Sequence, residues 1–337
     1  MKAKIRPRIN LKDRTRLETV IPLSTPYLVF LDPSDKCNFQ CRFCPTGSGE
    51  AKKYKKPMLM DFDLYKKIIS DLCEMPEPIK TLRLYSDGEP FLNPKFPEMV
   101  KYAEDTNRFG QIDTTTNGSL LTPKTSQEIV DAGLDKIFVS VPEDYDLVYI
   151  KGVTFLYNYG HKKESCKVYV KIIGDRLNEK RKNQFIQDFS NFSDYIFIEH
   201  LAPCWPEFEV RDVNKNVGIY GQSIGKEVNI CPYCFYSLKI NSDGSVSRCF
   251  LDWKHKYVIG DLKTEKITDI WNKQMRHFQK LMLKDRKSIR GCSDCGQLLY
   301  GAPDNIDQYA EELLKRMRSR QFLPAAKDDW VSLPDSK

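Results

Sequence analysis

The sequence lacks long apolar runs, blocks of like charge and a secretory leader pattern. No window approaches the roughly 20 apolar residues of a membrane-spanning helix, so we expect no membrane partner. The net charge is +7, but Lys and Arg are spread along the 337-residue chain. Charge therefore gives no support for a nucleic-acid partner, whereas an anionic small molecule fits this mild positive balance.

The cysteine content excludes a further class. Eleven cysteines in 337 residues are only a modest enrichment, and the first residues are basic and mixed rather than apolar. A secreted, disulfide-rich framework is therefore not indicated. Reduced cysteines predict a reducing compartment, most simply the cytoplasm.

Three cysteines stand close together in the segment 35–45, which reads DKCNFQCRFCP. Three thiolates can hold three irons of a [4Fe–4S] cluster, whereas clusters used for electron transfer usually have four cysteine ligands. The fourth iron is then open to a substrate or cofactor. A structural zinc site normally needs four ligands, and no nearby His completes this set.

Short strand-like segments alternate with helical patterns between residues 25 and 199. The predicted strands, rich in β-branched and aromatic residues, are 27–31, 81–85, 111–115, 136–141, 167–173 and 195–199. The helical patterns lie at 64–72, 94–106, 123–132 and 178–190. This alternation predicts a parallel sheet.

Two polar loops follow the second and third predicted strands. Residues 86–90 read SDGEP and residues 114–118 read TTTNG. On composition alone each is also an ordinary turn, because Asp-Gly, Glu-Pro and Asn-Gly favour turns.

The cysteine triplet, with Phe43 before its last cysteine, resembles the signature of the radical S-adenosylmethionine (SAM) superfamily. The resemblance implies that Cys37, Cys41 and Cys44 hold a [4Fe–4S] cluster whose open iron chelates SAM, with Phe43 near the adenine. One electron then cleaves SAM to methionine and a 5′-deoxyadenosyl radical, which abstracts hydrogen from a substrate.

The same resemblance implies an α/β fold, an open six-unit (β/α)6 partial TIM-like barrel whose strand C-termini form the catalytic face. The two polar loops resemble the family's "GEP" and "TNG" motifs. The residues that the resemblance places around SAM, besides Phe43, are Gly88, Glu89, Pro90, Thr116, Asn117, Ser140 and Lys171. For Lys171 ordinary surface exposure is the alternative.

A second group of cysteines lies in the last third of the chain, at 231, 234, 249, 292 and 295. A zinc ribbon from Cys231-x2-Cys234 and Cys292-x2-Cys295 is one interpretation, but the gap exceeds the usual 15–20 residues and Cys249 is left unused. A strand, an Asp-Gly turn and a second strand between 237 and 247 would bring Cys231 and Cys249 to one end of a hairpin.

The order of this region resembles the SPASM and twitch extensions of radical SAM enzymes. A hairpin and a Gly-containing turn precede an "IW" helix at 267–272 and a final Cys-x2-Cys. The resemblance implies an auxiliary [4Fe–4S] cluster held by Cys231, Cys249, Cys292 and Cys295. No cysteine follows the final pair, so we expect the shorter twitch-like form with one auxiliary cluster. Cys234 is left as an alternative ligand, a free thiol or a hydrogen donor to the substrate radical.

These features divide the chain into four expected parts. They are an N-terminal extension (1–24), the radical SAM partial barrel (25–225), the small auxiliary-cluster domain (226–303), and a C-terminal helix and tail (304–337). The helix, with apolar residues from Ile306 to Met317, is expected to pack back on the protein.

The expected function is that of an oxidoreductase or epimerase of the radical SAM type. It would act on a small polar substrate, such as a sugar or aminocyclitol, with help from the auxiliary cluster and a flavodoxin- or ferredoxin-type electron donor. The alternatives are a peptide- or protein-modifying maturase and, from another class, a non-catalytic iron–sulfur redox sensor.

Overall fold

The computed structural model describes residues 2–211 and 213–319. One ten-stranded sheet runs through it in the order β1-β7-β6-β5-β4-β3-β2-β8-β9-β10. The strands are β1 (Lys4–Ile5), β2 (Leu28–Leu31), β3 (Thr81–Arg83), β4 (Ile112–Thr116), β5 (Lys136–Ser140), β6 (Lys167–Ile173), β7 (Tyr195–Glu199), β8 (Ser237–Ile240), β9 (Ser245–Ser247) and β10 (Val258–Asp261). Strands β2 to β7 are all parallel. The sheet is open, as expected of a partial barrel.

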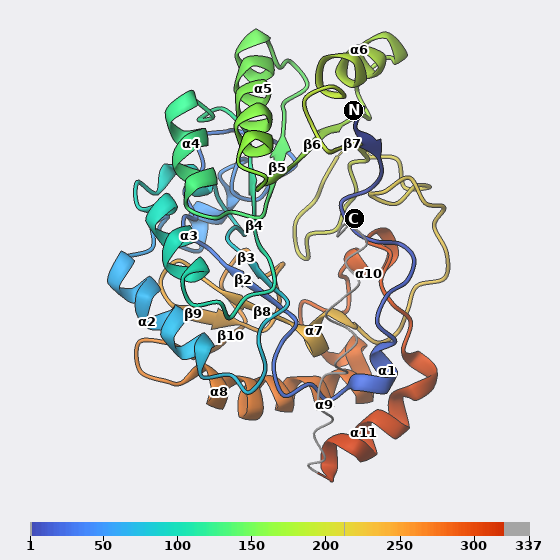
Figure 1. Ribbon diagram of the computed structural model, residues 1–337. Helices are drawn as coiled ribbons and strands as arrows, with labels where there is room; N and C mark the ends of the chain where they lie inside the picture. The colour runs from blue at the N-terminus through green and yellow to red at the C-terminus, as the bar shows by residue number, and fades with distance from the viewer. Residues whose placement is uncertain (1, 212, 320–337) are drawn as a thin grey trace.

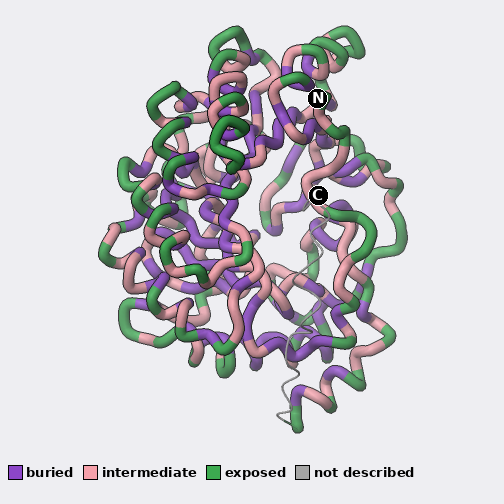
Figure 2. Tube along the Cα trace, in the orientation of Figure 1, coloured by how far each residue is buried: buried purple, intermediate pink, exposed green. Residues whose placement is uncertain are grey.

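The helices are α1 (Leu17–Val20), α2 (Phe62–Cys73), α3 (Phe96–Glu104), α4 (Pro123–Asp131), α5 (Leu147–Lys162), α6 (Glu179–Phe189), α7 (Tyr233–Tyr236), α8 (Ile267–Ile270), α9 (Arg276–Asp285), α10 (Gln297–Tyr300) and α11 (Ala310–Arg318). Helices α2 to α6 alternate with the parallel strands and cover the outer face of the sheet (Figure 1). Burial follows this layering, with buried strands inside and exposed helix faces outside (Figure 2). No helix among the described residues is long and apolar enough to cross a membrane.

All six strands expected from the sequence are present, and the four helical patterns expected between them are present with bounds that differ by at most two residues at either end. Helix α4 begins as its sequence indicates. The Thr122 side chain accepts a hydrogen bond from the Thr125 backbone N–H, and Pro123 occupies the first turn. Helix α11 packs against α9, with Leu313 fully buried. The tail beyond residue 319 lies outside the described residues.

Helix α5 was not predicted. Its 16 residues include two glycines and several aromatic and β-branched residues, which weaken a helical pattern. Gly152 has a packing reason, because a Cβ there would lie 2.8 Å from the Leu121 carbonyl oxygen. The glycine thus lets α5 lie close to the loop before α4.

The hairpin of the auxiliary region joins the main sheet. Strands β8 and β9 pair antiparallel, as predicted, and β8 also pairs in parallel with β2, with Leu28 opposite Ser237. No feature of the sequence predicts this second pairing. It places the cysteine-bearing hairpin directly beside the strand that precedes Cys37.

The N-terminal segment forms the opposite edge of the sheet. β1 pairs in parallel with β7, with Lys4 opposite Tyr195. The chain then runs toward α1 past the C-terminal region (Figure 1), where Arg14 donates hydrogen bonds to Ala302 O (2.9 Å) and Asp304 Oδ1 (3.0 Å). The segment therefore spans from the barrel edge to the auxiliary region.

Candidate active site

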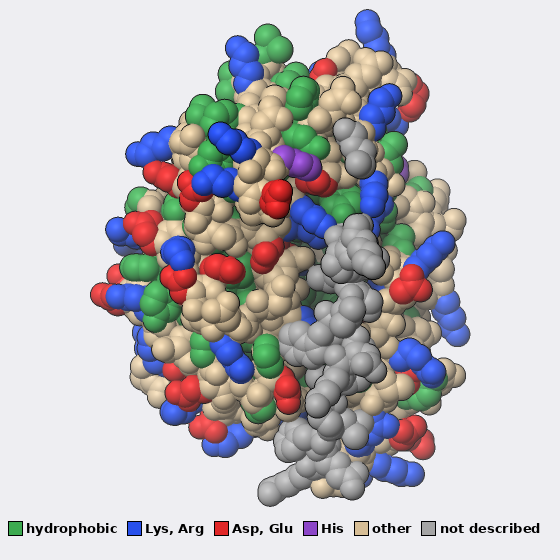
Figure 3. All heavy atoms as spheres, viewed as in Figure 1, with side chains coloured by type: hydrophobic (Ala, Val, Ile, Leu, Met, Phe, Trp, Pro, Cys, Tyr) green, Lys and Arg blue, Asp and Glu red, His purple; other side chains and the backbone are tan. Residues whose placement is uncertain are grey.

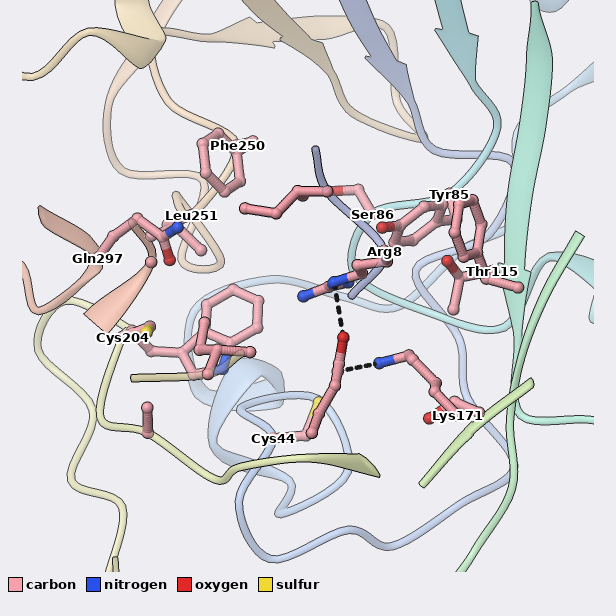
Figure 4. Close-up of a pocket in the computed structure, with 18 of the residues that line it drawn as sticks. Arg8, Cys44, Tyr85, Ser86, Thr115, Lys171, Cys204, Phe250, Leu251 and Gln297 are labelled. Atoms are coloured by element: carbon pink, nitrogen blue, oxygen red, sulfur yellow. Dashed lines mark hydrogen bonds and ion pairs between the residues drawn. The ribbon is translucent and has the colours of Figure 1, made fainter. Parts of the chain in front are cut away.

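A large cavity lies between the barrel and the auxiliary region. Its volume is about 1990 Å³, and its lining includes residues at the C-terminal ends of the parallel strands, the edge where such folds bind their ligands. The opposite wall includes Phe250, Leu251 and Gln297 (Figure 4). Acidic and basic side chains are interspersed over the outer face seen in Figure 3.

Cys37, Cys41 and Cys44 all line this cavity and are partly exposed. Burial raises the pKa of Cys41 to about 11, and the neighbouring Cys44 and Cys37 thiolate charges add to the rise. The three sulfur atoms are therefore close enough to influence one another. Phe43 lines the cavity beside them.

The 86–90 loop packs directly on the cysteine loop. A Cβ on Gly88 would lie 2.2 Å from the Ser34 carbonyl oxygen, so only glycine fits here. The Glu89 N–H donates to the Lys36 carbonyl oxygen (2.8 Å). The backbone of this loop is thereby fixed beside the cysteine triplet.

Glu89 ties this loop to the next one. Its buried carboxylate accepts hydrogen bonds from Thr116 Oγ1 (2.8 Å) and from the Asn117 backbone N–H (2.7 Å). The Asn117 amide in turn donates to Asn38 Oδ1 (2.8 Å). Glu89, Thr116 and Asn117 line the cavity together with Gly88, whereas the buried Pro90 is not among the lining residues.

Ser140 and Lys171 lie at the cavity on the neighbouring strands β5 and β6. The surface-exposure alternative for Lys171 is wrong, because the residue is buried and its ammonium lies 2.7 Å from Glu199 Oε2. Arg8 of the N-terminal segment reaches the same carboxylate, with its Nε 3.0 Å from Glu199 Oε1. Sequence reasoning missed both Arg8 and Glu199, since neither belongs to a motif.

The auxiliary cysteines come together from three separate segments. Burial raises the pKa of Cys295 to about 12, with contributions from the Cys231 and Cys292 charges. Burial also raises the pKa of Cys249, and the Cys295 and Cys231 charges add to it. These four thiols therefore share one site, none of them is among the residues that line the cavity, and Cys234 interacts with three of them.

A buried arginine supports this site. Arg286 donates hydrogen bonds to the carbonyl oxygens of Asn229 (2.9 Å) and Cys292 (2.5 Å). Its side chain is 1% exposed, and its guanidinium pairs with Glu227. A cation at this position favours the thiolate forms that bind iron.

Cys234 is not among the residues that line the cavity, and its role as ligand, free thiol or hydrogen donor stays a prediction. Its side chain is buried in the core, and its Sγ lies 3.3 Å from the Cys231 carbonyl oxygen. A hydrogen bond from Cys234 lowers the pKa of Cys231, whereas burial holds the pKa of Cys234 well above its ordinary value. In this structure the Cys234 thiol is therefore part of the core rather than of the cavity lining.

The two cysteine sets are alike in their fit to metal. No group of three or more His, Cys, Asp or Glu side chains in the described residues is arranged to hold a metal ion as it stands. The donor chemistry nevertheless fits iron–sulfur clusters, because each set consists of thiols alone and its members interact electrostatically.

A buried charge network joins the two regions beneath the cavity. Asp87 accepts hydrogen bonds from Lys239 Nζ of β8 at 2.9 Å and 3.0 Å. Lys55 and His255 approach the same carboxylate at 2.5 Å and 3.0 Å. Lys239 is fully buried and also donates to the Asp252 carbonyl oxygen (3.1 Å). The network thus anchors the loop that contains Gly88 to the auxiliary hairpin.

Comparison with known proteins agrees with this arrangement. Residues 31–168 match the model of the radical SAM superfamily, and residues 231–296 match SPASM, an iron–sulfur cluster-binding domain. A probable GTP 3′,8-cyclase of Methanococcus maripaludis (strain C6) is 32% identical over 272 residues, covering 78% of this chain and 83% of that protein. The tungsten-containing aldehyde ferredoxin oxidoreductase cofactor-modifying protein of Pyrococcus furiosus is 24% identical over 79% of this chain and 86% of its own.

Solved structures share the fold. BtrN in complex with AdoMet and 2-DOIA superposes with a TM-score of 0.54 at 19% identity, covering 80% of this chain and 92% of its own. Native anSMEcpe with bound AdoMet superposes with a TM-score of 0.57 at 14% identity, covering 87% and 98%.

The chain belongs to the radical SAM superfamily and carries a SPASM domain at its C-terminal side. The radical SAM domain implies that SAM and a [4Fe–4S] cluster are bound, and the SPASM domain implies auxiliary iron–sulfur clusters.

Proposed function

We propose that this radical SAM enzyme acts on a small polar substrate, such as a sugar or aminocyclitol, by oxidation or epimerisation. SAM and the cluster on Cys37, Cys41 and Cys44 supply the hydrogen-abstracting chemistry when they are bound. A flavodoxin- or ferredoxin-type protein would deliver the electron.

The observation that carries the proposal is one cavity bounded by both cysteine regions. The triplet lines one side, and the opposite wall is Phe250 and Leu251, which directly follow Cys249. The volume of about 1990 Å³ exceeds the 300–1,000 Å³ of an ordinary small-molecule site, which leaves room for SAM together with a small substrate.

Within this cavity the chain's own groups would position SAM and the substrate and shield them from water. The Gly88 loop offers backbone groups for the methionine part of SAM, and Asn117, Ser140 and Lys171 offer polar groups. Phe250 and Leu251 line the cavity directly after Cys249, and we assign the auxiliary thiols as Cys231, Cys249, Cys292 and Cys295. These apolar side chains exclude water between the substrate and the second cluster.

The test is anaerobic incubation of the iron-reconstituted protein with dithionite and SAM. Release of 5′-deoxyadenosine is expected and should be stimulated by the true substrate. A panel of sugars, aminocyclitols and short peptides, scored by deuterium transfer into 5′-deoxyadenosine, separates a small-molecule enzyme from a peptide maturase. No release under any reduction would favour the redox-sensor alternative and overturn the proposal.

A further inference from the structure

Arg8 enters the active-site cavity from a segment outside both matched domains. The radical SAM match begins at residue 31, whereas Arg8 follows β1 at the sheet edge. The pairing of β1 with β7 sets its position, and the Arg6 N–H donates to the Ile196 carbonyl oxygen (3.3 Å). Figure 4 shows the guanidinium between the barrel residues Tyr85 and Lys171 and the auxiliary wall.

Arg8 shares a single carboxylate with Lys171. Glu199 lies 3.0 Å from Arg8 Nε and 2.7 Å from Lys171 Nζ. Two cations on one anion leave this trio with a net charge of +1. Because Lys171 and Glu199 are 10% and 5% exposed, water solvates this excess charge poorly, and an anion nearby would be stabilised.

The Arg8 guanidinium has capacity for a ligand. An arginine carries five N–H donors, and Arg8 Nε, although close to Glu199 Oε1, lacks hydrogen-bond geometry toward it. A second contact goes to the Tyr220 hydroxyl. The Arg8 side chain is 27% exposed and lines the cavity, so the remaining donors are accessible from it.

The surroundings of Arg8 are electropositive. Arg83 is already committed to Asp113 by two hydrogen bonds of 2.7 Å and 2.8 Å. Burial acts to raise the pKa of Tyr85, but the Arg83 and Arg8 charges outweigh it and lower that pKa below its ordinary value. The field in this part of the cavity therefore favours negative charge.

We propose that Arg8, whose partner carboxylate Glu199 is also held by Lys171, binds an anionic phosphate or carboxylate group of the substrate. The inference rests on the proposed function and narrows its substrate class to anionic small molecules. A planar guanidinium binds either group through paired N–H donors. The bound anion would compete with Glu199 for Arg8 and neutralise the trio.

The test is isothermal titration of the reconstituted enzyme with pyrophosphate and, separately, malonate, with SAM present and no reductant. Saturable binding of one probe, weakening as salt is raised, is expected. Stronger binding of pyrophosphate identifies a phosphate substrate, and stronger binding of malonate a carboxylate. Displacement of SAM by the probe would assign Arg8 to the cofactor and overturn the proposal.

Two substitutions are expected to change the affinity for the probe in opposite directions. Arg8→Gln is expected to weaken binding about tenfold or more, the loss typical of a charged hydrogen bond. Glu199→Gln is expected to strengthen it, because the competing carboxylate is removed. The matched control is Arg16→Gln, which removes the same charge from the same segment at a side chain that is 73% exposed, and should bind as wild type.

If Glu199→Gln lost as much affinity for the probe as Arg8→Gln, the Arg8–Glu199 pair would have only a structural role, and the proposal would be overturned. Should Glu199→Gln fail to fold, Arg8→Lys decides, since it keeps the charge and should bind more tightly than Arg8→Gln. Equal affinity of these two variants would contradict it. Turnover is absent from these titrations, so failure here is distinguishable from failure of 5′-deoxyadenosine release.

Discussion

The two cysteine regions of this enzyme are built in opposite ways. Cys37, Cys41 and Cys44 lie within one loop of eight residues, are partly exposed and line the cavity. The auxiliary cysteines come from segments more than 60 residues apart at their extremes and are not among the residues that line the cavity. An open site for a reacting cofactor thus requires one short loop, whereas a shielded site requires several segments that close around it.

The largest effect should come from the first region. Cys41→Ala removes one of three thiols with no substitute nearby, so the cluster should be lost and 5′-deoxyadenosine release abolished. Cys73→Ala is the control, because Cys73 ends α2, away from both sets. The measurement is chromatography of anaerobic reactions. Release of 5′-deoxyadenosine by Cys41→Ala at the wild-type rate would show that the cysteine triplet takes no part in the cleavage of SAM.

The second region is probed by two neighbouring cysteines. Cys231→Ala should lower the iron content from about eight to about four per chain, since a four-iron cluster loses a ligand. Cys234→Ala should keep about eight, because Cys234 bonds to the Cys231 carbonyl oxygen instead. Colorimetric iron and zinc analysis measures this. Four irons with one zinc in the wild type would instead indicate a zinc ribbon.

The link between the regions can be broken at Lys239. Lys239→Met removes the fully buried partner of Asp87, while Lys55 and His255 remain beside the carboxylate. The loss of unfolding free energy should therefore stay below about 3–5 kcal/mol, the cost typical of a buried charge left without a partner. Urea unfolding should show this loss. Lys266→Met, in an exposed pair with Glu74, should change the unfolding free energy by only about 0.5 kcal/mol. Equal stabilities of the two variants would show that the link contributes little.

A smaller effect is expected from the pH dependence of stability. Burial, and then the Asp87 charge, raise the pKa of Asp32 to about 8. In the unfolded chain the pKa of an Asp is about 3.9. Between these values the folded protein keeps a proton that the unfolded chain has released. This group therefore makes stability fall as the pH rises from about 4 to about 8.

Asp32→Asn cannot ionise, so its unfolding free energy should fall less than that of wild type between about pH 5 and pH 8. Asp63→Asn is the control, because Asp63 is 85% exposed. Urea titrations at several pH values provide the measurement. Parallel pH profiles for wild type and Asp32→Asn would contradict the raised pKa.

The sequence predicted the parallel strands well because each is a short, continuous run whose composition is visible locally. Helix α5 was missed, since Gly152 serves a contact with Leu121 that no local pattern shows. The sequence left Cys234 as a ligand, a free thiol or a hydrogen donor, because its place relative to the cavity depends on how α7 packs. The domain boundaries expected at 24, 225 and 303 remain predictions.

By itself the sequence determined which residues form the cysteine triplet and the two polar loops, because residues a few positions apart are held close together by the chain itself. Only the tertiary structure brought Arg8 to Glu199 and Lys239 to Asp87, pairs separated by more than 150 residues. Such pairs form when strand pairing, of β1 with β7 and of β8 with β2, brings distant segments to one cavity.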